Sequence, residues 1–290
     1  MSHGSSPYTT VATLDAAKLI HGPGRVWHAV EGEYGARQAQ WLEDRFRRLL
    51  PEIPLIPEIA SNATHDAENH VAFIKSRGGE AQIKTCGPDE FLLASVMDLL
   101  GKWLTEGEAD RMPDGKHGAA FVSGGVEIVK IRGSSDRVVR LTTRNGDVVS
   151  LEMAHHAPQG SAFSDWAAAR YGQSMDVDGS YEGVIFPFFD FKQSSDHVWI
   201  KGLWTRLESG MRAKIIEYKS ALSVKGNHVG FRAVAVDEMK GNYESYSPPP
   251  VHPPFLIDKP FVLSVSRKGL SLPLVSAYLQ PDCWVDDVAL

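Results

Sequence analysis

A run of alternating apolar and polar residues near the middle of the chain constrains the fold most strongly. From Gly125 the side chains of 126–132 alternate with the period of two that characterises half-buried strands, and further strands are expected at 138–143 and 147–153. An Asn145-Gly146 pair interrupts the run, and this dipeptide is a strong signal for a two-residue hairpin turn. The segment therefore predicts a meander of strands, two of them joined as a hairpin.

Helical periodicity is found mainly before this run. Residues 36–50 carry apolar side chains at helical spacing, and a second helix is expected from Thr64 as N-cap to the Gly78-Gly79 pair. A short helix is also expected over 164–170. Early helices followed by a strand-rich body predict the α+β class.

Two apolar segments leave alternatives open. Residues 91–104 fit a helix by their spacing and a buried strand by their length and apolar density, and periodicity alone favours the helix. Residues 181–191 read as an aromatic strand, which Pro187 confines to a sheet edge or a bulge. Further strands are expected at 213–218, 229–236, 255–266 and 272–279.

One long exposed loop interrupts the strands. Residues 237–254 are polar and end in a Pro-rich run, too rich in proline for a helix and typical of extended polyproline geometry. No internal repeat and no linker divides the sequence, so residues 1–290 are expected to form a single domain.

The composition narrows the classes of partner and cofactor. The 290 residues include 36 acidic and 30 basic side chains, a net charge of -6 that argues against nucleic acid as a partner. Cys86 and Cys283 lie too far apart in sequence for a zinc motif, so reduced thiols and no metal or other cofactor are expected. No stretch reaches the roughly 20 apolar residues of a membrane helix, and the absence of a secretory signal points to the cytoplasm.

A few residues could carry acid–base chemistry. His155 and His156 follow a predicted strand and could bind a metal or act as a base, although a surface turn is the simpler interpretation without a third ligand. Asp165 and His197 could combine as acid and base, together with Asp190 and Asp196, if the fold brings them together. The familiar motifs of hydrolases, zinc proteases and nucleotide-binding proteins are absent from the sequence.

Several motifs together resemble the serpins. Phe255 with the Pro260-Phe261 pair resembles the segment that ends the reactive-centre loop in that family, and 184–191 resembles an upstream strand. Residues 69–83 resemble a helix and its exit, and Gly101-Lys102-Trp103 matches the Gly-x-Trp at the end of the central strand. The resemblance implies a serpin-like fold with a large mixed sheet, barrel-like sheets and peripheral helices, lacking most of the N-terminal helices. It also implies that 91–103 is a central strand of the largest sheet, against its helical periodicity.

The resemblance assigns a hinge to the strand before the loop. Inhibitory serpins insert the cleaved loop into the main sheet, which requires small hinge residues. Here the implied hinge residues are Gly230, Phe231, Ala233 and Ala235. Phe231 replaces the first small inserting residue and Asp237 follows, so added bulk and a buried carboxylate are expected to oppose insertion.

The resemblance also assigns a gate and a scissile bond. Ser95 and either Lys219 or Ser220 take the places of the Asn and His that latch the family's main sheet, with Trp103 nearby. The reactive bond would lie at Tyr246-Ser247 or Ser247-Pro248. Most serine proteases refuse a bond before proline.

The family role is the binding and inhibition of serine proteases. The departures at the hinge and gate lead us to expect a divergent, bacterial-type serpin-fold binding protein, non-inhibitory or weakly inhibitory, acting through a protein partner. That partner would be a serine protease or a pathway enzyme. An oligomer could cover a surface left by missing helices. The alternative is a serpin-like scaffold that has become an enzyme or enzyme subunit in small-molecule biosynthesis.

Overall fold

The computed structural model describes residues 1–131, 135–172, 175–233 and 252–290. They group into two compact units. Unit 1 comprises Met1–Pro7, Leu99–Lys192 and Leu222–Leu290, and unit 2 comprises Tyr8–Asp98 and Gln193–Ala221. Each unit is assembled from segments distant in sequence, and a single cooperative domain over 1–290 stays a prediction.

Unit 1 contains a seven-stranded antiparallel sheet, which confirms the predicted meander. The turn after Asn145 has Gly146 at φ 84°, a conformation that favours glycine. Of the predicted closing strands, 261–266 and 275–279 pair directly, with Leu263 opposite Ala277. The prediction of one strand over 255–266 is wrong, because 255–256 pairs with 184–185 in another sheet. The sheet order is β1 (His3–Ser5), β20 (Val275–Leu279), β19 (Phe261–Ser266), β10 (Val148–Met153), β9 (Arg137–Thr142), β8 (Val126–Ile131) and β11 (Met175–Val177).

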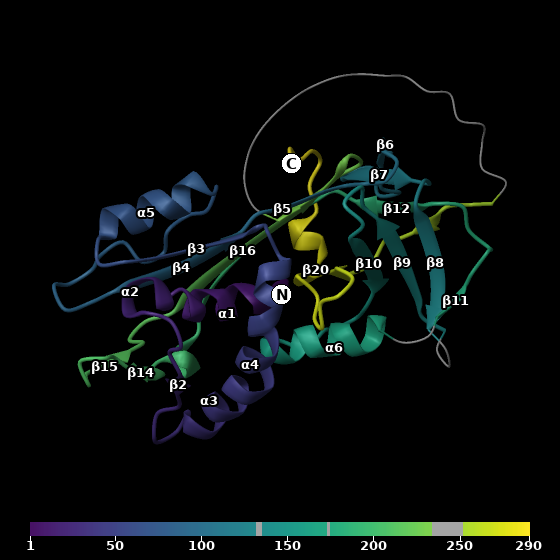
Figure 1. The fold of residues 1–290 in the computed structure, drawn as a ribbon. Helices are drawn as coiled ribbons and strands as arrows, with labels where there is room; N and C mark the ends of the chain where they lie inside the picture. The colour runs from purple at the N-terminus through teal and green to yellow at the C-terminus, as the bar shows by residue number, and fades with distance from the viewer. Residues whose placement is uncertain (132–134, 173–174, 234–251) are drawn as a thin grey trace. The chain divides into compact units, whose positions relative to one another are not determined.

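The helix expected at 164–170 covers one side of this sheet. Helix α6 (Ser161–Tyr171) contacts β1 and β20, and Phe163 packs with Val262 and Tyr278 in a buried cluster (Figure 1). Arg170 on α6 is ion-paired to the buried Glu152 of β10, and this pairing raises the pKa of the guanidinium. The helix is therefore fixed to the sheet by apolar packing and by charge.

A four-stranded sheet of unit 1 corrects the single aromatic strand predicted at 181–191. The chain forms β12 (Val184–Pro187), leaves the sheet at Phe188, and starts β13 at Phe189 in another sheet. Pro187 ends β12, because it has no N–H to donate to a continuing ladder. The order of this sheet is β18 (Phe255–Leu256), β12, β7 (Gly118–Val122) and β6 (Glu108–Arg111).

Residues 91–103 form strands, as the family resemblance implies and against their helical periodicity. Strand β4 (Leu92–Met97) pairs with β3 (Ile59–Thr64), and β5 (Leu99–Lys102) pairs with β17 (Gly230–Ala233). The sheet with β5 has the order β13 (Phe189–Asp196), β16 (Lys219–Gly226), β17 and β5. The prediction that 91–103 lies in the largest sheet is wrong, because the seven-stranded sheet contains neither β4 nor β5.

Unit 2 holds most of the helices. The helix predicted at 36–50 is present as a continuous run in which the middle turn is a π-helix. The helix predicted from Thr64 is α5 (Ala67–Ser76), which lies along β3 and β4 (Figure 1). Its cap is Asp66, whose carboxylate accepts from Glu68 N, while Thr64 Oγ1 accepts from Asp66 N. The other helical segments are α1 (Pro7–Asp15), α2 (Lys18–His21), α3 (Gly35–Trp41), η1 (Leu42–Phe46), α4 (Arg47–Leu49), η2 (Leu50–Leu55) and η3 (Val198–Ile200).

The sequence analysis did not predict α1 and α2. In α1 the apolar and polar side chains are hardly separated onto opposite faces, and α2 has only four residues, so helical periodicity gave little signal for either. Unit 2 also contains a three-stranded sheet of β15 (Arg212–Lys214), β14 (Trp204–Arg206) and β2 (Trp27–His28). In the described part of the chain, no helix is long and apolar enough to cross a membrane.

Candidate functional site

The strand that leads into the long loop is the centre of the candidate site. Strand β17 (Gly230–Ala233) is antiparallel to β5 on one side and to β16 on the other. All four of its residues are buried. The first part of the predicted hinge is therefore already a strand within a sheet, and it lies wholly in unit 1.

Phe231 is accommodated by a glycine directly across from it. Phe231 is fully buried and pairs in register with Gly101, where an added Cβ would lie 2.1 Å from Phe231 Cε1. The ring contacts Trp103 at a centroid distance of 5.8 Å, and Trp103 in turn meets Phe186 edge-on at 5.9 Å. In the described strand Gly101 leaves the space for the ring, and the expectation that Phe231 opposes loop insertion stays a prediction.

Asn227 holds the turn that enters β17. Its Oδ1 accepts from Val229 N at 2.8 Å and from Gly230 N at 3.3 Å. Its Nδ2 donates to Val288 O at 2.9 Å, and its backbone carbonyl oxygen accepts from Trp103 Nε1 at 2.9 Å. The side-chain amide of Asn227 thus joins the hinge turn to the C-terminal segment, and its backbone joins the turn to the Gly-x-Trp residue.

The C-terminal segment is tied to the neighbouring sheet as well. Val285 N donates to Phe188 O at 3.0 Å, and Gly118 N donates to Val285 O at 3.1 Å. Sequence analysis did not connect the last residues with the hinge, because nothing in a short polar tail indicates which backbone groups it will meet.

The remaining hinge and loop predictions lie outside the described residues. These are Ala235, Tyr246, Ser247 and Pro248, and most of the loop at 237–254. The described strand ends at Ala233.

The predicted gate residues have other partners than the family pattern implies. Ser95 on β4 shares a hydrogen bond of 2.7 Å between hydroxyls with Ser61 on β3. Ser220 on β16 is 2.7 Å from His197 Nε2, and Lys219 is ion-paired to Glu217. These pairs all lie in unit 2, whereas Trp103 lies in unit 1.

His197 and Ser220 were predicted for different roles, and the structure brings them together. Burial lowers the pKa of His197, while the neighbouring Asp196 opposes that shift. The ring is also 5.1 Å from that of Tyr218. The hydrogen bond between His197 and Ser220 on β16 is therefore expected to change when the imidazole is protonated.

The other acid–base candidates are dispersed. His155 and His156 are exposed between β10 and α6, and Asp165 is exposed on α6. Asp190 in unit 1 is within 3.6 Å of Lys225, whereas Asp196 in unit 2 is within 3.5 Å of Lys201. Among the described residues, no three metal-ligating side chains form a group that could hold an ion.

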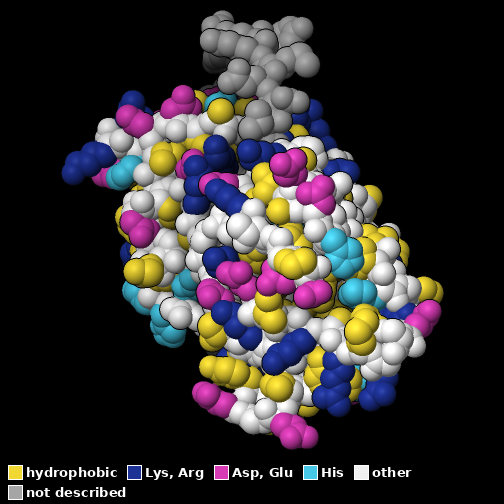
Figure 2. Space-filling model, turned by 90° about the vertical axis from the view of Figure 1, so that its left-hand side faces the viewer, with side chains coloured by type: hydrophobic (Ala, Val, Ile, Leu, Met, Phe, Trp, Pro, Cys, Tyr) yellow, Lys and Arg dark blue, Asp and Glu magenta, His cyan; other side chains and the backbone are white. Residues whose placement is uncertain are grey.

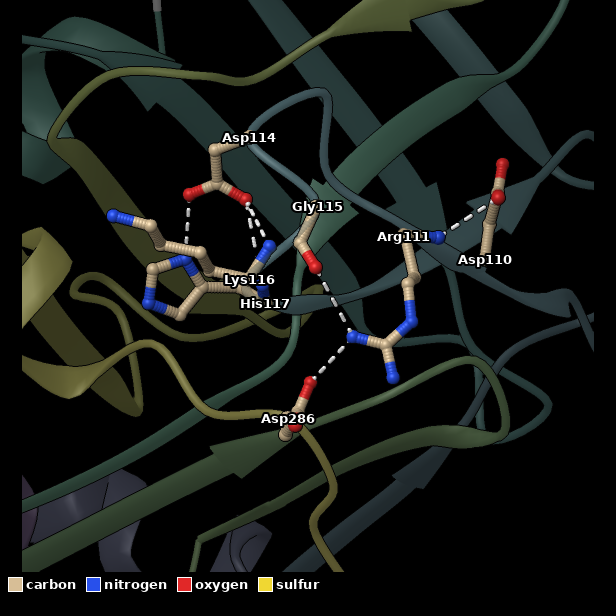
Figure 3. A network of polar contacts seen from close by, with 7 residues as sticks. All are labelled: Asp110, Arg111, Asp114, Gly115, Lys116, His117 and Asp286. Atoms are coloured by element: carbon tan, nitrogen blue, oxygen red, sulfur yellow. Dashed lines mark hydrogen bonds and ion pairs between the residues drawn. The ribbon is translucent and has the colours of Figure 1, made fainter.

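A histidine–carboxylate pair that sequence analysis missed lies in the turn between β6 and β7. His117 Nδ1 lies 2.7 Å from Asp114 Oδ2, while Asp114 Oδ1 accepts from the backbone N–H of Lys116 at 2.9 Å (Figure 3). These bonds lower the pKa of Asp114. The Asp-x-x-His spacing within a Gly-containing turn was the available signal. The pair fixes the orientation of one imidazole, and Arg111 nearby is ion-paired to Asp286 of the C-terminal segment (Figure 3).

Both cysteines are free, as expected. Cys283 is buried, and burial raises the pKa of its thiol to about 11. This thiol is therefore a poor nucleophile at neutral pH.

Comparison with known proteins gives a result only at the level of structure. No family model matches the sequence, and no curated protein matches it. Thyroxine-binding globulin in complex with thyroxine has a TM-score of 0.59 at 9% identity, covering 96% of this chain and 92% of that chain. A highly specific serpin of the insect Tenebrio molitor has a TM-score of 0.56 at 10% identity, covering 99% and 92%. The mouse protein-Z dependent protease inhibitor has a TM-score of 0.56 at 11% identity, covering 96% and 90%. The chain therefore has the serpin fold, in a strongly divergent sequence.

Proposed function

We propose that this protein is a serpin-fold binding protein that acts through a protein partner and has lost efficient loop insertion. The observation that carries the proposal is the alternation along β17. Phe231 and Ala233 are buried residues two apart in one strand, so their side chains point to the same face.

Continuing this strand would bury a charge. With a period of two, Ala235 and then Asp237 would follow Phe231 and Ala233 on the same apolar face. An unpaired carboxylate in an apolar interior is costly and is avoided by protonation or by not entering. Insertion would therefore stall within a few residues of Ala233, although Phe231 itself is well accommodated.

The gate supports the same proposal. Ser95 and Ser220 each form a hydrogen bond to another partner, Ser61 and His197. Opening the sheet along this line would not release the Asn–His latch of the family pattern. One of the similar structures is a thyroxine-binding globulin with its ligand, so a binding role has a precedent on this fold.

The test compares the loop-cleaved protein with the intact one. The loop is cut with a chymotrypsin-like protease, and thermal melting is measured before and after, with a gel assay for an SDS-resistant protease complex. We expect a melting change of a few degrees at most and no complex. A rise of tens of degrees would overturn the proposal, since each kcal/mol of stabilisation raises Tm by roughly 2–4 °C in a chain of this size.

A pair of variants isolates the role of Asp237. Asp237→Ala removes the charge on the face that carries Phe231 and Ala233, and Glu238→Ala removes a charge on the opposite face, which already carries the charged Arg232, as the matched control. We expect cleavage to stabilise only the Asp237 variant further. Equal behaviour of the two variants would show that alternation along the strand does not limit insertion.

The alternative function, an enzyme or enzyme subunit in small-molecule biosynthesis, predicts a different effect of loop cleavage on activity. Turnover would survive cleavage of the loop. Partner binding through this part of the fold would be altered by it.

A further inference from the structure

The three-stranded sheet of unit 2 has one packed face and one basic face. Its buried side consists of Trp27, Thr205 and Ala213, which are at most 6% exposed. Because side chains alternate along each strand, the residues between them point the other way. That outer face carries His28, Trp204, Arg206, Arg212 and Lys214.

The two arginines lie directly opposite each other. Arg206 on β14 pairs in register with Arg212 on β15, and Lys214 pairs in register with Trp204. Like charges across neighbouring strands are mildly destabilising, so the fold gains nothing from this arrangement. Among the described residues, neither Arg206 nor Lys214 has an ion pair that would offset the repulsion.

Trp204 is held rigidly in the centre of the face. The His28 ring stacks on it at a centroid distance of 4.5 Å, and the Arg212 guanidinium carbon lies 4.3 Å from the centroid. The indole Nε1 donates to Ala29 O at 3.3 Å. Tryptophan and arginine dominate the residues that contribute most to protein interfaces, and a side chain already immobilised loses little entropy on binding.

Apolar side chains flank the edge strand. Met211 and Ile216, just before and after β15, are 64% and 62% exposed. Figure 2 shows the side of the protein on which Figure 1 places β14 and β15, and Lys and Arg side chains gather near its lower end. The face therefore combines unpaired positive charge with exposed apolar groups.

We propose that this face of the β15–β14–β2 sheet binds an extended acidic segment of a partner protein. The inference rests on the proposed function as a partner-binding protein and names the surface and the chemistry. Arg212 and Lys214 are two residues apart, about 6.8 Å along the strand. Acidic residues at alternate positions of an extended segment repeat at the same spacing, so successive carboxylates meet successive cations.

The apolar flanks favour a protein partner over nucleic acid. Three unpaired cations on a chain of net charge -6 form a small patch, whereas nucleic-acid sites need a basic stripe along many phosphates. Ile216, exposed two residues beyond Lys214, matches an apolar side chain of a peptide and has no counterpart in a sugar–phosphate backbone.

The test uses a labelled peptide of alternating Glu and Val, with a peptide of alternating Gln and Val as control, measured by fluorescence anisotropy. The full chain is expected to bind the acidic peptide at least about tenfold more tightly, with affinity falling as salt rises. R206Q/R212Q/K214Q should lose about tenfold in affinity. The matched control K75Q/R77Q/K84Q removes three exposed charges elsewhere in unit 2 and should bind as the parent does.

A charge reversal guards against a folding artefact. Arg212→Glu should weaken binding of the Glu–Val peptide and improve binding of a Lys–Val peptide, which a merely destabilised protein would not do. The proposal fails if the two triple variants bind alike, if the Gln–Val peptide binds equally well, or if single-stranded DNA of similar length binds more tightly. Loop-cleavage melting should be the same in R206Q/R212Q/K214Q and in the parent, so failure here is distinguishable from failure of the proposed function.

Discussion

The hinge and the gate both depart from the serpin pattern, and different interactions stabilise the substituted residues at the two places. At the hinge, a bulky Phe231 is matched by the absence of a side chain at Gly101, so shape complementarity fixes the strand. At the gate, the small hydroxyls of Ser95 and Ser220 each form a hydrogen bond to a polar partner, Ser61 on β3 and His197 just after β13. Buried packing contributes several kcal/mol per residue, whereas a partly exposed hydrogen bond contributes about one or less. The comparison therefore predicts that substitutions at the hinge lower the unfolding free energy more than substitutions at the gate.

The largest effect should come from removing the ring at the hinge. Phe231→Ala leaves a cavity against Trp103 and should cost about 3–5 kcal/mol of unfolding free energy. Urea denaturation followed by Trp fluorescence measures it. A cost below about 1 kcal/mol would mean that the ring is not buried against Trp103 as described.

The glycine opposite the ring should show strong coupling to it. Gly101→Ala places a methyl group against Phe231 and should cost about 1–3 kcal/mol alone. In a Phe231→Ala background the same change should cost much less, because the space is then free. A double-mutant cycle measures the coupling. Additive costs would show that Gly101 and Phe231 do not depend on each other, and the comparison between hinge and gate would then fail.

Asn227 should contribute at an intermediate level. Asn227→Ala leaves Val288 O and the N–H groups of Val229 and Gly230 without this partner, at a cost of roughly 1–3 kcal/mol. Asn227→Asp keeps the acceptor for the two N–H groups and loses the donor to Val288 O. An intermediate cost for the Asp variant, by the same denaturation assay, would show that both the turn and the C-terminal segment depend on this amide.

The gate should respond to pH. Burial lowers the pKa of His197 below the ordinary value of a histidine, so the folded state favours the neutral ring. Its stabilising contribution is complete above the unfolded pKa and is lost as pH falls toward the lower folded pKa. His21 and His70 shift in the same direction, so the wild type minus His197→Gln difference isolates this residue. Melting curves from pH 8 to pH 5 should converge for the two proteins as pH falls; parallel curves would exclude a role for His197.

The smallest effect should come from the exposed half of the gate. Ser61→Ala removes one hydroxyl of the Ser61–Ser95 pair and should change the unfolding free energy by less than about 0.5 kcal/mol. A change as large as that at Asn227 would show that the gate is as firm as the hinge.

The sequence by itself determined the local elements whose signals agree with one another. The meander over 126–153, its turn at Gly146, the helix at α6 and the closing strands are all fixed by alternation, turn chemistry and helical spacing. The family motifs added the strand character of 91–103, which periodicity alone assigned to a helix. In that segment, pairing with β3 and β17 outweighs helical spacing, and burial alternates along β5 as it does in a strand with one covered face.

Only the tertiary structure decided which distant groups meet. The sequence shows a large Phe231 where the family has a small residue, and that alone indicates steric conflict; the register that sets Gly101 across from it removes the conflict. Asn227 bonding to Val288 and His197 bonding to Ser220 join positions 61 and 23 residues apart. The basic face of β14 and β15 likewise arises from strand register. Local propensity acts over a few residues, whereas these contacts depend on how whole strands align, which is set by the packing of the entire unit.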